Sequence, residues 1–97
     1  MTYNLKFLPS AFKEWNRLDT TIKKQLKKKL AERLVNPHVP SARLSGFENH
    51  YKIKLRALGY RLVYEVLNPE KSLLVIAVGK REKNSIYSTA KSRTTHH

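Results

Sequence analysis

The sequence contains no cysteine, only three glycines and only seven acidic residues in 97. Without cysteine, disulfides and thiolate chemistry are excluded, and nothing indicates an oxidising compartment. The three glycines are too far apart to form a Gly-rich phosphate loop. The scattered acids predict no paired-carboxylate site, and the four histidines show no metal-ligand spacing. The sequence therefore does not support a nuclease of the usual His/Glu or two-metal kind.

Long apolar runs are also missing, since none approaches the roughly 20 residues of a transmembrane helix. The N-terminal segment MTYNLKF does not resemble a signal peptide, so we expect a cytoplasmic protein with no membrane partner. A hydrophobic content of 40% is compatible with a single folded domain, which we assign to residues 1–93. Residues 94–97 end in two histidines and are set aside as a tail, either native or left by a purification tag.

Basic residues dominate the charged positions. Lys and Arg number 20 against seven Asp and Glu, so the formal charge is 20 − 7 = +13 with histidine neutral. This excess predicts a polyanionic partner, which is RNA, DNA, an acidic membrane surface or an acidic protein.

Periodicity in the first third of the chain predicts a strand followed by two helices. Residues 2–8 alternate weakly between apolar and polar side chains, which indicates a short strand. The first helix is expected to bury one side, with Phe12, Trp15 and Leu18. Residues 19–21 are a capping cluster, and the second helix that they begin ends at Asn36, before a proline. Its apolar stripe repeats at spacing four, with Ile22, Leu26, Leu30 and Leu34.

The second half of the chain predicts three strands and a weak terminal helix. The strands are expected at 50–56, 60–67 and 72–79, and the helix at 83–93. The third strand is apolar on both faces, which favours a central position in the sheet. We therefore predict an α+β fold: an N-terminal strand, an αα-hairpin, a three-stranded antiparallel run that completes a four-stranded sheet, and a short C-terminal helix.

The segment YKIKLR at residues 51–56 alternates apolar and basic side chains. Alternation at period two is typical of a half-buried strand, so three cations should project from one face: Lys52, Lys54 and Arg56. A row of like charges is destabilising by itself. Its presence indicates a bound anion, and the commonest extended anion is a nucleic-acid backbone.

The turn at Leu58-Gly59 predicts how this strand pairs with the next. A two-residue turn would pair Arg56 with Arg61 and Lys54 with Val63. Arg61 then joins the basic face, while the apolar residues of both strands face the helices. A register shifted by one residue would bury the cations instead.

Each candidate also has a structural interpretation. The strand cations and Lys80-Arg81 are alternatively a solvated surface, and Lys27–Lys29 a solvated helix face. Tyr87 alternatively packs a terminal helix on the sheet. In the functional interpretation, arginine and lysine stabilise phosphate charge directly, a lysine among other cations gives up its proton more readily, and tyrosine stacks on an unpaired base.

Five motifs resemble those of the RelE toxins of bacterial toxin–antitoxin pairs. They are FKEW at 12–15, QLKKKL at 25–30, YKIKLR at 51–56, GYRLVY at 59–64 and VGKRE at 78–82, with Tyr87 five residues further on. The resemblance extends to the spacing between motifs and covers the chain up to about residue 90. It implies the α+β fold predicted above.

The resemblance also implies a ribosome-dependent endoribonuclease that cuts mRNA in the ribosomal A site, without metal or cofactor. The 2′-OH would attack its own phosphate and leave a 2′,3′-cyclic phosphate and a 5′-OH. The family's cleavage positions match Lys52, Lys54, Arg61, Arg81 and Tyr87. One of the two lysines would assist deprotonation of the 2′-OH, Arg61 would stabilise the phosphate, Arg81 would serve the transition state or leaving oxygen, and Tyr87 would stack on or orient the base. Further RNA contacts are expected from Arg56, Lys80, Lys27 and Lys28.

The partners implied by the resemblance are the 70S ribosome with its rRNA and mRNA, and a RelB-like antitoxin. We expect the antitoxin to be acidic and partly disordered, and to cover the basic face. Operator DNA would be contacted only through the antitoxin complex. The chain departs from the family in two places. The loop before the sheet lacks the basic residue that relatives often have near Ser45, which predicts a weaker RNA contact. The terminal helix, where the antitoxin competes, is less apolar, which predicts weaker docking.

Two other functions remain as alternatives. ParE-type toxins are similar in fold but inhibit DNA gyrase without cleaving RNA, and they lack the full set of five cleavage residues. A plain basic RNA-binding module would need the basic face but not Arg81 and Tyr87 together.

Overall fold

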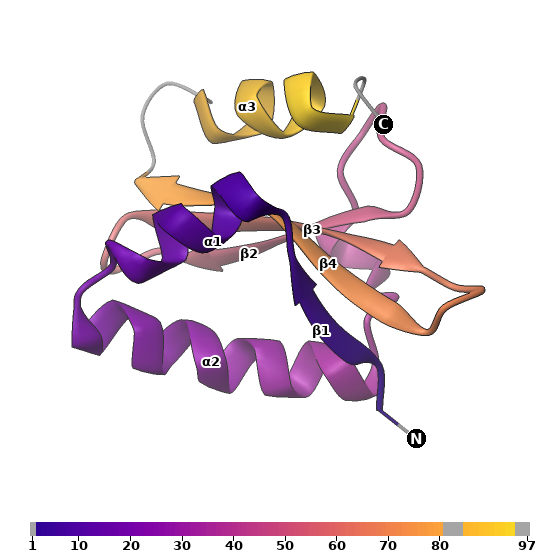
Figure 1. Cartoon of the computed structure of the whole chain (residues 1–97), viewed down its shortest axis with the longest axis horizontal. Helices are drawn as coiled ribbons and strands as arrows, with labels where there is room; N and C mark the ends of the chain where they lie inside the picture. The colour runs from indigo at the N-terminus through magenta and orange to yellow at the C-terminus, as the bar shows by residue number, and fades with distance from the viewer. Residues whose placement is uncertain (1, 81–84, 95–97) are drawn as a thin grey trace.

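The computed structural model describes residues 2–80 and 85–94 of the chain. Its elements are β1 (Asn4–Phe7), α1 (Pro9–Asn16), α2 (Thr20–Val35), a 3₁₀ turn (Pro40–Ala42), β2 (His50–Leu55), β3 (Tyr60–Leu67), β4 (Ser72–Lys80) and α3 (Ser85–Thr94). The strands form one sheet in the order β1-β4-β3-β2, with β1 parallel to β4 and the other neighbours antiparallel. Helices α2 and α3 lie on opposite sides of the sheet (Figure 1). The predicted α+β fold is confirmed, and β4 is central as expected.

Helix α1 buries Trp15 as predicted, and Leu18 just beyond it is partly buried, but Phe12 does not face the core. Ala11 and Trp15, four residues apart, are buried, whereas Phe12 is 50% exposed. Because α1 is only two turns long, its contact with the sheet is the narrow stripe made by positions 11 and 15, and position 12 lies beside that stripe. The Phe12 ring instead meets the edge of Phe7, with ring centroids 5.5 Å apart.

Helix α2 follows the sequence prediction closely. The Asp19 carboxylate accepts a hydrogen bond from the Ile22 N–H at 3.0 Å, which caps the helix start. Ile22, Leu26 and Leu30 are buried against the sheet, and Leu34 is partly buried at the end of the same stripe. This face of the sheet holds the larger hydrophobic core.

The β2–β3 hairpin has a different register from the predicted one. Lys54 pairs with Arg61, and Leu55 is the last paired residue, so Arg56 lies in the turn rather than opposite Arg61. The turn closes with a hydrogen bond from Gly59 N–H to the Leu55 carbonyl at 2.8 Å, and Gly59 has a φ of 71°. A left-handed residue at this position favours glycine, and it allows a wider turn than the expected two-residue one.

Strand β4 is apolar on both faces because it contributes to a core on each side of the sheet, and a β-bulge interrupts it. Val63 pairs with Ala77 but Tyr64 pairs with Val75, so Ile76 is the extra residue. Ile76 and Ala77 both contribute to a second, smaller core, which α3 covers. Among the described residues, no helix is long and apolar enough to cross a membrane.

Candidate active site

Three basic side chains of the hairpin share one face of the sheet. Lys54 lies opposite Arg61, and Lys52 lies opposite Val63. Directly opposite residues and alternate residues along a strand point to the same face, so Val63 identifies which face this is. Val63 belongs to the core under α3. Lys52, Lys54 and Arg61 therefore lie on the α3 side of the sheet, as predicted. The prediction was wrong for Arg56, which lies in the turn after β2.

Arg61 is the most unusual of these residues, because it is a charged residue that is only 7% exposed. Its Nη1 donates to the Tyr60 carbonyl at 3.3 Å, and no carboxylate of the described residues forms an ion pair with it. Arginine is almost never buried unless paired, because removing an unpaired charge from water costs stability. The arrangement is typical of a site that an external anion completes.

Tyr87 lies on α3, which packs over the same face as Arg61. A Cβ built on Gly79, the residue opposite Arg61, would lie 3.5 Å from Ile86 Cδ1, so the first turn of α3 comes close to the sheet here. Tyr87 is half-buried and packs against the core under α3. It therefore packs on the sheet, as the structural interpretation predicted, and it lies on the side of the sheet that carries Arg61.

The other predicted residues are more dispersed. Arg81 lies outside the described residues, and Lys80 is exposed at the end of β4. Arg56 is exposed in the turn after β2. Lys27 and Lys28 are exposed on α2, which packs against the opposite face of the sheet. The structure therefore does not bring Lys27 and Lys28 to the face of Arg61.

Two hollows continue the basic surface around the outer edge of β2 toward α2. The first has a volume of about 250 Å³ and is lined by Arg33, Ser41, Ala42, Lys52, Lys54 and Arg56. The second, of about 350 Å³, is lined by Gln25, Lys29, Lys54, Leu55, Arg56, Ala57 and Leu58. Sequence reasoning missed Arg33, although its position four residues after Lys29 places both cations on one side of α2.

Arg33 connects α2 to the sheet through Tyr64. Its Nη1 donates to the Lys52 carbonyl at 3.1 Å and to the Tyr64 hydroxyl at 3.0 Å. The Tyr64 hydroxyl in turn donates to the Pro37 carbonyl at 2.7 Å. Burial raises the pKa of Tyr64 above its usual 10.0, and this effect outweighs the hydrogen bond and the charge of Arg33, which both lower it.

Replacing Tyr64 by phenylalanine should change the stability of the protein at alkaline pH. The folded Tyr64 keeps its proton at a pH where the unfolded chain loses it, because its pKa is raised above 10.0 on folding. Its contribution is therefore complete below about pH 10 and is lost as the pH rises through the folded pKa. Urea unfolding at a series of pH values from 9 upward should show a shallower loss of stability for Tyr64→Phe than for the wild type. Parallel curves would contradict the raised pKa.

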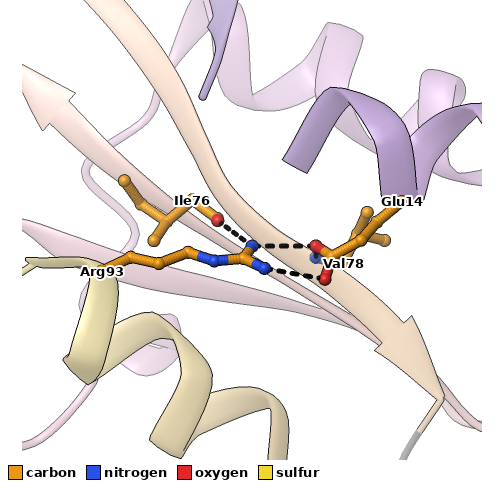
Figure 2. Close-up of polar contacts among 4 residues, drawn as sticks. All are labelled: Glu14, Ile76, Val78 and Arg93. Carbon is orange, nitrogen blue, oxygen red and sulfur yellow. Dashed lines mark hydrogen bonds and ion pairs between the residues drawn. The ribbon is translucent and has the colours of Figure 1, made fainter. Parts of the chain in front are cut away.

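Glu14 and Arg93 join α1 to α3 across β4 (Figure 2). Nη1 and Nη2 of Arg93 donate to the two carboxylate oxygens of Glu14, each at 2.9 Å. Arg93 Nη1 also donates to the Ile76 carbonyl at 2.7 Å, and the Val78 N–H donates to Glu14 Oε1 at 3.2 Å. Since β1 pairs with β4 only as far as Val75, this Glu14–Arg93 clamp satisfies backbone groups of β4 beyond the end of β1.

Comparison with known proteins identifies relatives along nearly the whole chain. The family model described as "ParE toxin of type II toxin-antitoxin system, parDE" matches residues 5–85. A "Putative RelE-like toxin protein" of Escherichia coli is 50% identical over 93 residues, which are 96% of this chain and 98% of that protein. The "mRNA interferase toxin RelE" of Escherichia coli strain K12 is 48% identical over 93 residues, with the same coverage of both chains.

Solved structures show the same relationship. A double arginine variant of E. coli toxin RelE in the free state superposes with a TM-score of 0.88 at 47% identity, covering 96% of this chain and 98% of that one. RelE in the intact E. coli RelBE toxin–antitoxin complex gives a TM-score of 0.81 at 48% identity, covering 84% of this chain and 99% of that one.

Proposed function

The chain belongs to the RelE toxins of the RelE/ParE superfamily, and on this basis we propose that it is a ribosome-dependent mRNA endoribonuclease that inhibits translation. The structural observation that carries the proposal is the buried Arg61, which faces Lys54 and has no carboxylate partner among the described residues. A cation held in this way is suited to stabilise the charge that develops on a phosphate during cleavage. Because the proposed target is mRNA on the ribosome, we propose that the protein acts in the cytoplasm.

The proposed reaction takes place at the mRNA codon in the ribosomal A site. The 2′-OH attacks the adjacent phosphate, the bond to the 5′ oxygen of the next nucleotide breaks, and a 2′,3′-cyclic phosphate and a 5′-OH remain. Lys52 or Lys54 assists removal of the 2′-OH proton, and Arg61 stabilises the phosphate charge. Arg81 is assigned to the transition state or leaving oxygen, and Tyr87 to the base. The ribosome is needed because this set contains no strong base and depends on a substrate held in line.

A RelB-like antitoxin is the proposed partner that restrains the activity. Solved structures of relatives include the intact E. coli RelBE complex and an E. coli RelE variant bound to an antitoxin peptide. The formal charge of +13 favours an acidic antitoxin segment lying over the basic face. Operator DNA would be bound only by the complex, through the antitoxin.

Gyrase inhibition is the second candidate function, because the matching family model is described by its ParE toxins. The experiment that separates the two functions adds the purified chain to a translation reaction containing end-labelled mRNA and, in parallel, to a gyrase supercoiling reaction. We expect the mRNA to be cut only when ribosomes are present, and supercoiling to be unaffected. Inhibited supercoiling with intact mRNA would reject the endoribonuclease proposal in favour of the ParE-type activity, and RNA binding with neither effect would indicate a plain binding module.

A further inference from the structure

We propose that Arg33, Lys52 and Arg56 form a phosphate subsite at the outer edge of β2, which holds an RNA phosphodiester beside the cleavage face. The subsite rests on the proposed function, because it gives the RNA a second point of attachment next to Arg61. Its main component, Arg33, comes from α2 and was not among the residues expected to bind RNA.

The subsite is the hollow of about 250 Å³ between the end of α2, the 3₁₀ turn and β2. Its lining combines basic side chains with the hydroxyl-bearing Ser41 and the small Ala42, and no carboxylate of the described residues lines it. The volume is below the roughly 300–1,000 Å³ of pockets that enclose drug-sized molecules. A phosphate with part of its sugar fits this hollow better than a whole enclosed base.

Arg33 is held in place before any ligand arrives. The two N–H groups of Nη1 donate hydrogen bonds to the Lys52 carbonyl and the Tyr64 hydroxyl. Among the described residues, no partner bonds to Nε or Nη2 of Arg33. Paired N–H donors of a guanidinium match two oxygens of a phosphate, and an arginine that is already ordered loses little conformational entropy on binding.

Position links this hollow to the cleavage face. Lys52 contributes its carbonyl to the anchoring of Arg33 and its side chain to the basic face of β2. Arg56 is exposed at the end of the same strand and makes no hydrogen bond or ion pair with the described residues. An RNA strand lying on the cleavage face therefore reaches the hollow without leaving the protein surface.

The alternative is that Arg33 is purely structural and serves only to bind Tyr64 and the β2 backbone. Both roles predict that replacing Arg33 alters stability. Only the phosphate subsite predicts a change in the salt dependence of RNA binding, because each protein–phosphate contact releases counterions from the nucleic acid.

The test measures binding to a 2′-O-methyl RNA hexanucleotide, which cannot undergo 2′-OH attack, at several salt concentrations. For Arg33→Gln, the slope of log K against log salt should become shallower by about 0.7, the value of one single-strand phosphate contact, with affinity lowered several-fold at low salt. Arg56→Gln should show a similar change. The matched control is Arg17→Gln, an exposed arginine before the start of α2, which begins about 20 Å of helix away from Arg33. Its slope should equal that of the wild type.

Mutant slopes equal to that of Arg17→Gln would overturn the subsite. If Arg33→Gln does not fold, Arg56→Gln decides, because an exposed turn residue is not needed for folding.

The same salt series with mRNA-free ribosomes identifies the source of the phosphate. A change in slope seen only with ribosomes assigns the phosphate to ribosomal RNA, and a change in slope with the hexanucleotide assigns it to mRNA. Weakened binding of an acidic antitoxin segment, with both RNA slopes unchanged, would reject an RNA subsite. Cleavage by the wild type in the translation reaction is scored separately, so loss of the subsite and loss of the proposed function give different results.

Discussion

Replacing Arg61 by methionine should lower mRNA cleavage by about 10²–10³-fold, the loss typical of removing one charge-stabilising donor, while leaving the protein at least as stable as the wild type. The wild-type protein buries the Arg61 charge beside Lys54 without a carboxylate among the described residues. An apolar side chain of similar length removes this desolvation cost, so the free energy of unfolding should rise by about 1 kcal/mol or more. Urea unfolding and cleavage in a translation reaction measure the two effects on the same preparation.

The control for this prediction is Arg17→Met, which removes the same charge from an exposed site. We expect both its cleavage and its stability to stay close to those of the wild type. A stability loss of several kcal/mol in Arg61→Met, with cleavage reduced only in proportion to the unfolded fraction, would show that Arg61 is a structural residue. Higher stability together with lower cleavage is the combination expected when a residue is kept for function at a cost in stability.

Breaking the Glu14–Arg93 clamp should release α3 from the sheet and lower cleavage about tenfold, the activation free energy rising by about 1.4 kcal/mol. Helix α3 has ten residues, too few to be stable alone in water, so its structure depends on docking. Glu14 and Arg93 are 28% and 21% exposed, and their two parallel bonds are worth about 1–2 kcal/mol after allowance for solvent. Glu14→Gln or Arg93→Met should therefore lower Tm by about 5–10 °C.

A double-mutant cycle isolates this interaction. The single variants Glu14→Gln and Arg93→Met should show a coupling energy above about 1 kcal/mol when combined. The Lys6–Glu70 pair is a control within the same protein, because its atoms are 3.5 Å apart and both side chains are more than half exposed. Lys6→Met and Glu70→Gln should show almost no coupling energy when combined. A clamp coupling as small as that of this exposed pair would mean that α3 docks through its apolar residues alone.

The parts of the fold that depend on local periodicity were predicted from the sequence. The spacing of Ile22, Leu26 and Leu30 identified the buried side of α2, and alternation at residues 51–56 identified the basic face. Both succeed because a helix or strand period determines which side chains share a side. Phe12 shows the limit of this reasoning, since a two-turn helix has too few positions to define its buried stripe.

The hairpin register could not be predicted, because a shift of two residues leaves every side chain on its own face. The hydrophobic pattern is the same for the predicted pairing of Arg56 with Arg61 and for the observed pairing of Lys54 with Arg61. The turn decides between them, through the left-handed Gly59 and its hydrogen bond to Leu55. The consequence for the site is that Arg56 moves from the centre of the basic face to the hollow beside it.

The Glu14–Arg93 clamp and the bond between Arg33 and Tyr64 were beyond sequence reasoning for a different reason. Glu14 and Arg93 are 79 residues apart, and Arg33 and Tyr64 are 31 apart. No local period relates such positions, and a single charged residue on a helix is usually solvated. Only the order of strands in the sheet, which places the end of β4 between α1 and α3, creates the first contact.

The role of Arg61 in ribosome-dependent cleavage is tested most directly by mapping the 5′ ends of mRNA in a translation reaction with the wild-type chain and with Arg61→Met. The wild type should produce new 5′-OH ends within translated codons, none in the same mRNA without ribosomes, and about 10²–10³-fold fewer with Arg61→Met. Ends that appear without ribosomes, or that persist undiminished in the variant, would contradict the assignment of Arg61 and its face as the site of ribosome-dependent cleavage.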